Sequence, residues 1–233
     1  MEEKTTIPIW KQVPLKRILL LLILLYLAAL IVPYIPHKKV SDSFRKSFSE
    51  KDFYSDSTGT ERAAYIDDNT EALLYRLRMI EEAEDEIILS AFDFNSDRGG
   101  RDVLASLMSA ADRGVSVRII VDGVSGFLDL RGDPWFQAAA AHENIEIRVY
   151  NPFNFLKPWD MQARLYDKYL IVDRRMYLLG GRNTTTLFLG DYSSSKNIDR
   201  ELFIYETVDS PNSSLYQLLD YFERVWNLEE SRD

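Results

Sequence analysis

The hydrophobic and polar positions divide the chain into an apolar run near its start and a long stretch of mixed pattern. From residue 18 to residue 36 there are 19 residues without a charge, bounded by Lys16-Arg17 and Lys38-Lys39. As a helix this run would extend about 28 Å, close to the hydrocarbon thickness of a bilayer. It lacks the polar stripe that a helix in a soluble domain would show. The pattern predicts one transmembrane helix over residues 18–36, preceded by a basic flank at residues 1–17.

The alternative reading of this run is a cleaved signal peptide, because basic residues precede the apolar residues near the N-terminus. The run is long for such a signal and has no small-x-small cleavage site at its end, so an uncleaved signal anchor is favoured. Four basic residues precede the run and five follow it within about fifteen residues, so the positive-inside rule does not choose an orientation. We expect a single-pass membrane protein, and its reading as a signal anchor favours an extracytoplasmic domain.

The remainder of the chain contains a predicted juxtamembrane linker and one folded domain. Residues 37–66 show no sustained period of 2 or 3.6 and are predicted to be the linker, whereas residues 67–233 alternate between helical spacing and short apolar runs. The expected elements are a helix carrying Leu73 to Ile80, strand 87–92, helix 103–113, strand 115–121, helix 133–143, strand 145–150, strands 164–172 and 176–179 around a hairpin at 173–175, strand 201–206 and helix 213–226. This alternation is typical of an α/β fold. The predicted fold class is a layered mixed β-sheet flanked by helices, preceded by one transmembrane helix.

The residue composition removes several kinds of site. The 233 residues are enough for the membrane segment and one domain with a sizeable core. There is no cysteine, which excludes disulfides, thiolate metal sites and cysteine nucleophiles. The two histidines are His37, at the membrane boundary, and His142, near a helix end, and we interpret both as structural or solvent-exposed. We expect neither a metal site nor a cofactor.

Charge is distributed unevenly along the chain. The net charge is −9 at neutral pH, yet residues 1–39 carry six Lys or Arg against two Glu, a net charge of +4, which leaves −13 for the rest. An acidic domain repels a polyphosphate backbone over roughly a Debye length. The charge therefore argues against nucleic acid as a partner, but it leaves room for a local phosphate pocket.

A group of polar residues in the second half of the domain indicates an anion site. On the expected strand, Tyr166 and Lys168 are two residues apart, so their side chains would share one face. The next strand ends in Gly180-Gly181, where backbone can approach a ligand closely, and Asn183 adds an amide. A lysine, an amide and exposed N–H groups together describe an oxyanion pocket. Taken alone, a lysine on a strand or a Gly-Gly turn is more often structural.

The run from residue 164 to residue 183 resembles the phospholipase D superfamily, whose signature is H-x-K-x4-D-x6-G-G/S-x-N. The residues that match in order and spacing are Lys168, Asp173, Gly180, Gly181 and Asn183. Tyr166 stands in the place of the histidine. The resemblance covers roughly residues 65–228 and points to the bacterial membrane-anchored, cardiolipin-synthase-like branch.

The resemblance implies an enzyme built from two similar halves that each contribute one motif to a shared active site. One histidine attacks phosphorus to form a phosphohistidine, the other protonates the leaving alcohol, and the lysines and asparagines bind phosphoryl oxygens. This chain carries one motif. The implied partners are a membrane phospholipid and a second motif-bearing half, either in cis or as another subunit. We favour the first arrangement, in which this chain is the N-terminal half of a longer protein.

The tyrosine at position 166 changes the chemistry that the resemblance implies. An imidazole with a pKa of about 6.5 is largely neutral at pH 7 and forms a labile phosphoramidate, whereas a phenol with a pKa of about 10 is protonated and forms a more stable aryl ester. We therefore predict that this chain alone is inactive. We consider it less favoured that Tyr166 acts as an alternative nucleophile. The favoured interpretation is that Tyr166 marks a lesion or an evolved loss of the catalytic histidine.

Other residues receive roles from the resemblance or from strand parity. Glu201 stands where the family places an acidic residue that orients the histidine, and Asp199 is its rival. Asp173 is seven residues from Tyr166 and opposite to it in strand parity, so we expect it to cap the hairpin.

Several aromatic residues have two possible roles. A lipid entry groove could be lined by aromatic residues, namely Trp135, Trp159 and the pair Phe153 and Phe155. The favoured interpretation is that these side chains pack within the core or the loops.

We consider three possible functions for the domain as a whole. The first is a membrane-anchored phosphodiesterase or phosphatidyltransferase half-domain that is impaired in this chain by Tyr166. The second is a non-catalytic module that binds phosphate or an anionic headgroup through Lys168 and Asn183. The third, nuclease action by a homodimer, is disfavoured by the acidic charge and the apolar run.

Overall fold

The computed structural model describes residues 15–35, 39–49, 51, 54, 58–210 and 213–232. These residues fall into two compact units. One unit comprises Met1–Ser49 with Asn154–Ala163, and the other comprises Glu50–Phe153 with Arg164–Asp233. Residues 1–14 of the predicted basic flank, Pro36 at the end of the predicted span and His37 lie outside the described residues.

The first unit contains the apolar helix that the sequence predicts. Helix α1 (Leu15–Ile31) continues into the 3₁₀ turn η2 (Val32–Tyr34), and no side chain of either is buried. These 20 residues form the one helix in the described part of the chain that is long and apolar enough to cross a membrane. The same unit holds the short helix α2 (Asp42–Ser47) and the 3₁₀ turn η5 (Pro158–Asp160).

The second unit is built on an eight-stranded mixed sheet. Its strands are β1 (Glu61–Ile66), β2 (Glu86–Ala91), β3 (Ser116–Asp122), β4 (Ile145–Tyr150), β5 (Tyr169–Val172), β6 (Met176–Gly180), β7 (Glu201–Glu206) and β8 (Ser231–Arg232). Their order in the sheet is β1-β7-β6-β5-β2-β3-β4-β8. Strands β2, β3 and β4 run parallel, and the other neighbours pair antiparallel.

Helices connect and cover these strands. They are α3 (Asn69–Glu81), α4 (Arg98–Asp112), α5 (Gly123–Ser125), the π-helical turn η4 (Gly126–Leu130), α6 (Pro134–Ala140) and α7 (Ser214–Trp226). Helix α3 begins at Asp68, whose Oδ1 accepts the N–H groups of Thr70 and Glu71 at 2.8 and 2.9 Å. Helix α7 begins in the same way at Ser213, whose side chain accepts the N–H of Leu215. Both caps satisfy amides that have no partner within the helix.

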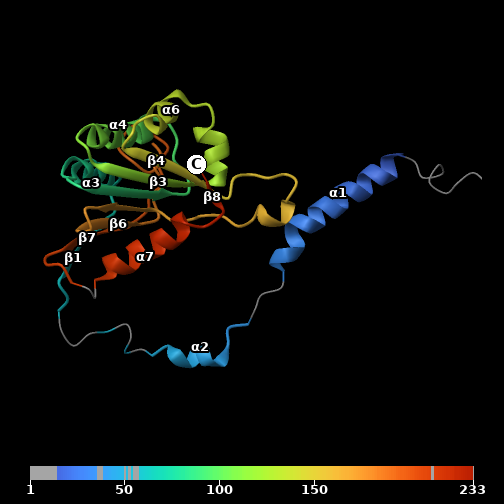
Figure 1. Ribbon diagram of the computed structural model, residues 1–233, viewed down its shortest axis with the longest axis horizontal. Helices are drawn as coiled ribbons and strands as arrows, with labels where there is room; N and C mark the ends of the chain where they lie inside the picture. Colours follow the sequence, from blue (N-terminus) through green and yellow to red (C-terminus); the bar gives the residue numbers. More distant parts are fainter. Residues whose placement is uncertain are drawn as a thin grey trace, which may run out of the picture. The chain divides into compact units, whose positions relative to one another are not determined.

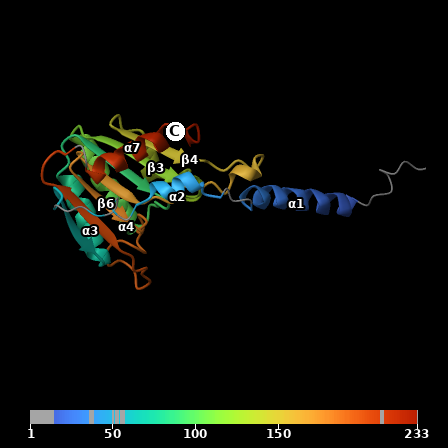
Figure 2. The same ribbon diagram turned by 90° about the horizontal axis from the view of Figure 1, so that it is seen from below.

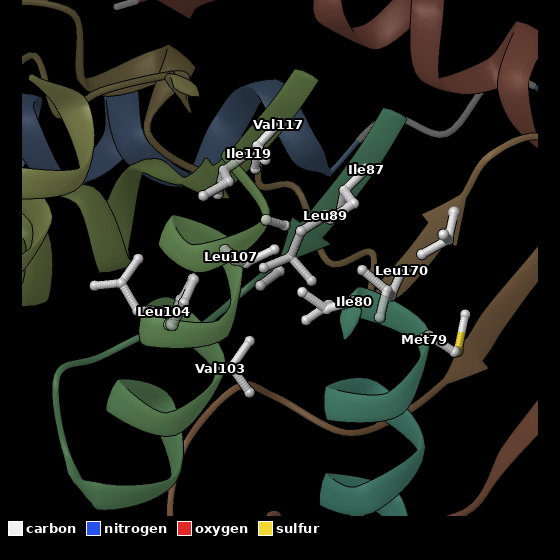
Figure 3. Close-up of a cluster of buried hydrophobic side chains, with 14 of the residues drawn as sticks. Met79, Ile80, Ile87, Leu89, Val103, Leu104, Leu107, Val117, Ile119 and Leu170 are labelled. Carbon is white, nitrogen blue, oxygen red and sulfur yellow. The ribbon is translucent and has the colours of Figure 1, made fainter. Parts of the chain in front are cut away.

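The main core lies between the sheet and helices α3, α4 and α6. Ile87 and Leu89 on β2 point to this side and meet leucines of α4. Figure 3 shows Leu104 and Leu107 of α4 directed toward the strands. Because side chains alternate along a strand, Ile88 points to the opposite side, where it packs with residues of α7. Figure 1 shows α3 and α4 on one side of the sheet and α7 on the other, which explains why β2 is apolar on both faces.

The predicted fold class, a layered mixed sheet flanked by helices with one apolar helix ahead of it, is confirmed. Strands 145–150 and 201–206 have the predicted bounds.

The structure differs from the sequence prediction at two strands. The predicted linker at 37–66 contains β1, an edge strand with mostly exposed or half-buried side chains, so its pairing with β7 leaves little apolar pattern to detect. Strand β5 begins at Tyr169 and not at Arg164. The backbone before β5 is tied instead to the end of β3, because Oδ2 of Asp122 accepts the N–H of Leu165 at 2.7 Å.

Candidate functional site

The sheet register brings the predicted site residues together at one end of the strands, which we call this edge of the sheet. Strand β2 ends at Ala91, and the antiparallel β5 begins beside it, with Ser90 paired to Tyr169. Strand β6 ends at the same edge, where Gly180 pairs with Glu201 at the start of β7. The chain beyond β2 is also joined to the chain beyond β6, because Asp93 O accepts the N–H of Thr184 at 2.9 Å. Segments 92–95, 166–168, 181–184 and 199–201 therefore meet at this edge.

Lys168 is a buried cation at this edge. Its residue is 5% exposed, and its Nζ donates a hydrogen bond of 2.9 Å to the carbonyl of Tyr166. Among the described residues, no carboxylate forms an ion pair with it. Burial lowers the pKa of Lys168, and the carboxylates of Asp167, Asp199 and Asp93 act in the opposite direction. The lysine thus has negative charges around it without a direct contact to one of them.

Tyr166 lies against the lysine and not in a strand. The Nζ of Lys168 is 3.3 Å from the centroid of the Tyr166 ring, a cation–π distance. The same ring packs on Phe92, with ring centroids 4.8 Å apart. Tyr166 is nevertheless 69% exposed, so its phenol faces solvent at the position that the resemblance assigns to a histidine.

Gly180 at the end of β6 and Gly181 after it are packed against the chain that leads into β7. A Cβ on Gly180 would lie 2.5 Å from the carbonyl oxygen of Arg200, and a Cβ on Gly181 would lie 2.3 Å from a carboxylate oxygen of Asp199. Position 180 requires glycine because backbone approaches it closely, whereas the near neighbour of position 181 is the end of a side chain. Their predicted role in approach to a ligand stays a prediction.

Asn183 is half-buried beyond the two glycines. Its Oδ1 is shielded from solvent and has no hydrogen-bond partner among the described residues. A buried amide oxygen without a partner is unusual in a folded protein. The amide of Asn183 is therefore available to a ligand. That Asn183 and Lys168 bind the same anion stays a prediction.

Glu201 is held in a buried network of ions. Its residue is 2% exposed, and its Oε2 accepts a hydrogen bond of 2.7 Å from Arg76 on α3. The Nε of Arg182 lies 3.6 Å from the same oxygen. Burial lowers the pKa of Arg182, and Glu201 opposes that shift. The carboxylate of Glu201 is thus engaged by two arginines, whereas the rival Asp199 lies beside Gly181 and acts on the charge of Lys168.

Asp173 lies at the far end of β5 from Lys168. Its carboxylate accepts the N–H groups of Glu84, Asp85 and Glu86 at 2.8, 2.8 and 2.9 Å. The residue has a left-handed φ of 52° in the turn between β5 and β6. The structure therefore places Asp173 in a link between this turn and the start of β2, apart from the other motif residues.

The structure adds a carboxyl group that the sequence analysis did not single out. Asp93 lies two residues after the end of β2 and lines a cavity of about 260 Å³ together with Asn95, Ser125 and Asp129. Burial, helped by the charges of Asp129 and Asp97, raises the pKa of Asp93 to about 6, while Lys168 acts in the opposite direction. The available signal was a carboxylate two residues after a mostly apolar strand, at the end of a sheet where ligands often bind.

The aromatic residues suggested for a lipid groove belong to both compact units. Trp135 lies on α6 with Arg101 over its ring at 5.7 Å, and Phe153 packs edge-on against Phe127 at 5.6 Å. Phe155 and Trp159 belong to the unit that contains α1. In the described part of the chain, no group of three or more His, Asp or Glu is arranged to hold a metal ion.

Comparison with known proteins identifies related sequences. A family described as cardiolipin synthase, PLD-like domain, matches residues 77–226. An uncharacterized protein of Helicobacter pylori (strain ATCC 700392 / 26695) is 27% identical over 183 residues, which cover 72% of this chain and 34% of that protein. Cardiolipin synthase C of Escherichia coli (strain K12) is 29% identical over 136 residues, which cover 54% of this chain and 28% of that protein. The chain thus spans about a third of the length of these curated relatives.

A solved structure shares the fold. Nuc of Salmonella typhimurium, described as a phospholipase D family member, superposes with a TM-score of 0.53 and 23% sequence identity. The match covers 74% of this chain and 96% of the Nuc chain. The two proteins therefore share the fold.

Proposed function

This chain belongs to the family of cardiolipin synthase, PLD-like domains, and from that premise we propose that it is a membrane-anchored phosphodiesterase or phosphatidyltransferase half-domain that acts on phospholipid phosphodiesters. The observation that carries the proposal is Lys168, a buried ammonium group without a carboxylate partner among the described residues. An unpaired buried charge is unfavourable unless a ligand completes its surroundings. A phosphoryl oxygen would supply that missing negative charge.

The groups around Lys168 suit a phosphodiester. Asn183 has an amide without a partner for its Oδ1, and the end of β6 brings it to the edge where Lys168 lies. Asp93, with a pKa of about 6, is protonated in part of the molecules near neutral pH and is able to donate a proton or accept one. Charge stabilisation and proton transfer are two of the tasks that phosphodiester cleavage requires of a protein.

The same surroundings explain why we expect the chain alone to be impaired. At the position expected for a nucleophilic imidazole, the phenol of Tyr166 is exposed and its ring is used to cover Lys168. A phenol attacks phosphorus poorly unless a base removes its proton. A second motif-bearing half, in cis or as another subunit, would supply the histidine that this chain lacks at its motif.

A second candidate function is a non-catalytic module that binds phosphate or an anionic headgroup. It is favoured by the contact between the Tyr166 ring and the ammonium group of Lys168, which stabilises the cation without giving it a nucleophilic neighbour. Such a module would retain anion binding by Lys168 and Asn183 and lose turnover.

The membrane assignment is part of the proposal. The apolar helix of Leu15–Tyr34 would serve as a single-pass anchor, followed by the domain on one side of the membrane. The acidic domain disfavours nucleic acid as a substrate, and a phospholipid is the phosphodiester that an anchored domain meets at high local concentration.

The test compares wild type, Tyr166→His and Tyr166→Phe on a chromogenic phosphodiester and on phosphatidylglycerol vesicles. Each protein is assayed alone and with a co-expressed second half that carries an intact histidine motif. We expect no turnover by any of the three alone and turnover by Tyr166→His with the second half, because loss of a nucleophile from a cooperating set costs about 10⁴ to 10⁶ in rate.

Two outcomes would redirect the proposal. Turnover by wild type but not by Tyr166→Phe would identify Tyr166 as the nucleophile and contradict the predicted impairment. Absence of turnover in every combination, with binding of inorganic phosphate that Lys168→Met abolishes, would support the non-catalytic module instead.

A further inference from the structure

Residues 154–163 pack against the apolar helix within one compact unit. The phenol of Tyr34, at the end of η2, donates a hydrogen bond of 2.7 Å to the carbonyl of Trp159. The phenol of Tyr26, two turns earlier in α1, lies 3.8 Å from the sulfur of Met161. Figures 1 and 2 both show η5 beside the C-terminal end of α1. The segment is thus joined to the part of the chain that is able to enter a bilayer.

The backbone of this segment is suited to surroundings poor in water. The N–H groups of Lys157, Asp160, Met161 and Ala163 all bond to carbonyls within the segment, at 2.9 to 3.3 Å. The N–H of Leu156 bonds to Oδ1 of Asn154 at 3.0 Å. These internal bonds lower the cost of placing the segment where water is scarce, because an unsatisfied backbone polar group is unfavourable there.

Three large apolar side chains of the segment are exposed to solvent. Leu156 is 87% exposed, Phe155 is 58% exposed and Trp159 is 46% exposed. Exposed aliphatic and aromatic groups beside a transmembrane helix are characteristic of the interface between hydrocarbon and water, where tryptophan and tyrosine are enriched. Tyr34 and Trp159 together form an aromatic pair of this kind at one end of the helix.

We propose that residues 154–163 form a membrane-interface turn that inserts Leu156 and Trp159 among the lipids at the C-terminal end of α1. The proposal rests on the proposed membrane anchoring and adds a second lipid contact to it. From Tyr34 to Tyr26 the chain rises about 12 Å along a helix, so both contacts of the turn lie within that distance of the C-terminal end of the apolar helix. Along the chain the turn ends at Ala163, three residues before Tyr166.

The absence of cysteine makes a direct test available, because single cysteines can be introduced into the full chain without removing any. Three variants are labelled with an environment-sensitive fluorophore: Leu156→Cys in the turn, Leu22→Cys within α1 and Leu74→Cys on α3. All three side chains are exposed, at 87%, 57% and 43%, so substitution leaves the core intact. Each labelled protein is reconstituted into vesicles of phosphatidylcholine and phosphatidylglycerol and challenged with aqueous iodide or with lipids that carry a nitroxide at the headgroup or deep in the chain.

We expect the label at position 156 to be quenched by the headgroup nitroxide, with a several-fold lower iodide quenching constant than the label at position 74. The label at position 22 should respond to the deep nitroxide. Adding Trp159→Lys to Leu156→Cys should return the iodide quenching constant toward that of position 74, because a lysine anchors less apolar surface.

Other quenching results would contradict either the membrane-interface turn or the proposed anchoring. If position 22 is quenched by the deep nitroxide while position 156 behaves like position 74, the anchoring holds and the membrane-interface turn is wrong. If position 22 itself is open to iodide, the proposed anchoring fails. If position 156 is shielded from iodide but unaffected by either nitroxide, a protein surface covers the turn, and lipid insertion is wrong.

Discussion

Lys168 shows how one buried ammonium group depends on its neighbours. Burial lowers its pKa, while three nearby carboxylates, those of Asp167, Asp199 and Asp93, favour its charged form. The ring of Tyr166 adds a cation–π contact at 3.3 Å. None of these contacts is the direct charge-assisted hydrogen bond that a phosphoryl oxygen would provide. The site is therefore arranged around a cation whose strongest partner would come from a ligand.

Asp93 is the matching case for a carboxyl group. Its pKa is raised from 3.8 to about 6, because burial and the charges of Asp129 and Asp97 disfavour the ionised form. A raised pKa means that the folded protein binds a proton more tightly than the unfolded chain does. The stabilisation is fully present below about pH 4 and is lost as the pH rises through about 6.

We predict that Asp93→Asn raises the free energy of unfolding at pH 8 by about 2 kcal/mol and leaves it unchanged near pH 4. The asparagine has nearly the same shape and does not ionise, so it removes the cost of a charge in this position. Denaturant unfolding of the full chain in detergent micelles, followed by tryptophan fluorescence at pH 4, 6 and 8, measures the difference.

The control for this prediction is Asp191→Asn, which alters a carboxylate whose side chain is 73% exposed. We expect a change within about 0.5 kcal/mol at every pH. A gain for Asp93→Asn of the same size at pH 4 and at pH 8 would contradict the raised pKa.

At the scale of elements, the register of four strands determines which residues meet. Strands β2 and β6 end, and β5 and β7 begin, at one edge of the sheet. Asp173 stabilises the opposite end of β5, where its carboxylate joins the β5–β6 turn to the first residues of β2. The β5–β6 turn therefore does not contact the site. It affects the site only by keeping β5 and β2 aligned.

We predict that Asp173→Ala lowers the free energy of unfolding by about 3 kcal/mol, since it removes the acceptor of three backbone N–H groups and places alanine at a left-handed φ. Asp173→Asn should lower it by about 1 kcal/mol, because asparagine tolerates this conformation and retains one acceptor oxygen. Urea unfolding of both variants provides the comparison. Equal losses in the two variants would show that the carboxylate contributes nothing beyond what the amide provides.

At the scale of the whole molecule, the apolar helix should decide location. We predict that the full chain stays in the membrane pellet after a carbonate wash, because a 20-residue apolar helix embedded in the bilayer is not extracted by high pH. A variant that lacks residues 15–35 is the control and should move to the soluble fraction. Recovery of the full chain in the carbonate supernatant would contradict the anchoring proposal.

The sequence by itself determined the family, the apolar helix and most elements of the domain. The motif residues lie within a run of 20 positions, and strands 145–150 and 201–206 follow from local hydrophobic runs. Such patterns are readable because periodic burial leaves its trace within a few neighbouring residues. The edge strand β1 escaped detection for the converse reason, since most of its side chains are not buried.

The tertiary structure alone decided the contacts that connect distant parts of the chain. Glu201 accepts a hydrogen bond from Arg76, 125 residues away, and Trp159 accepts one from Tyr34, also 125 residues away. The raised pKa of Asp93 likewise depends on burial and on Asp129 of η4. Desolvation and charge coupling depend on distances in space, and residues this far apart in sequence acquire those distances only when the chain folds.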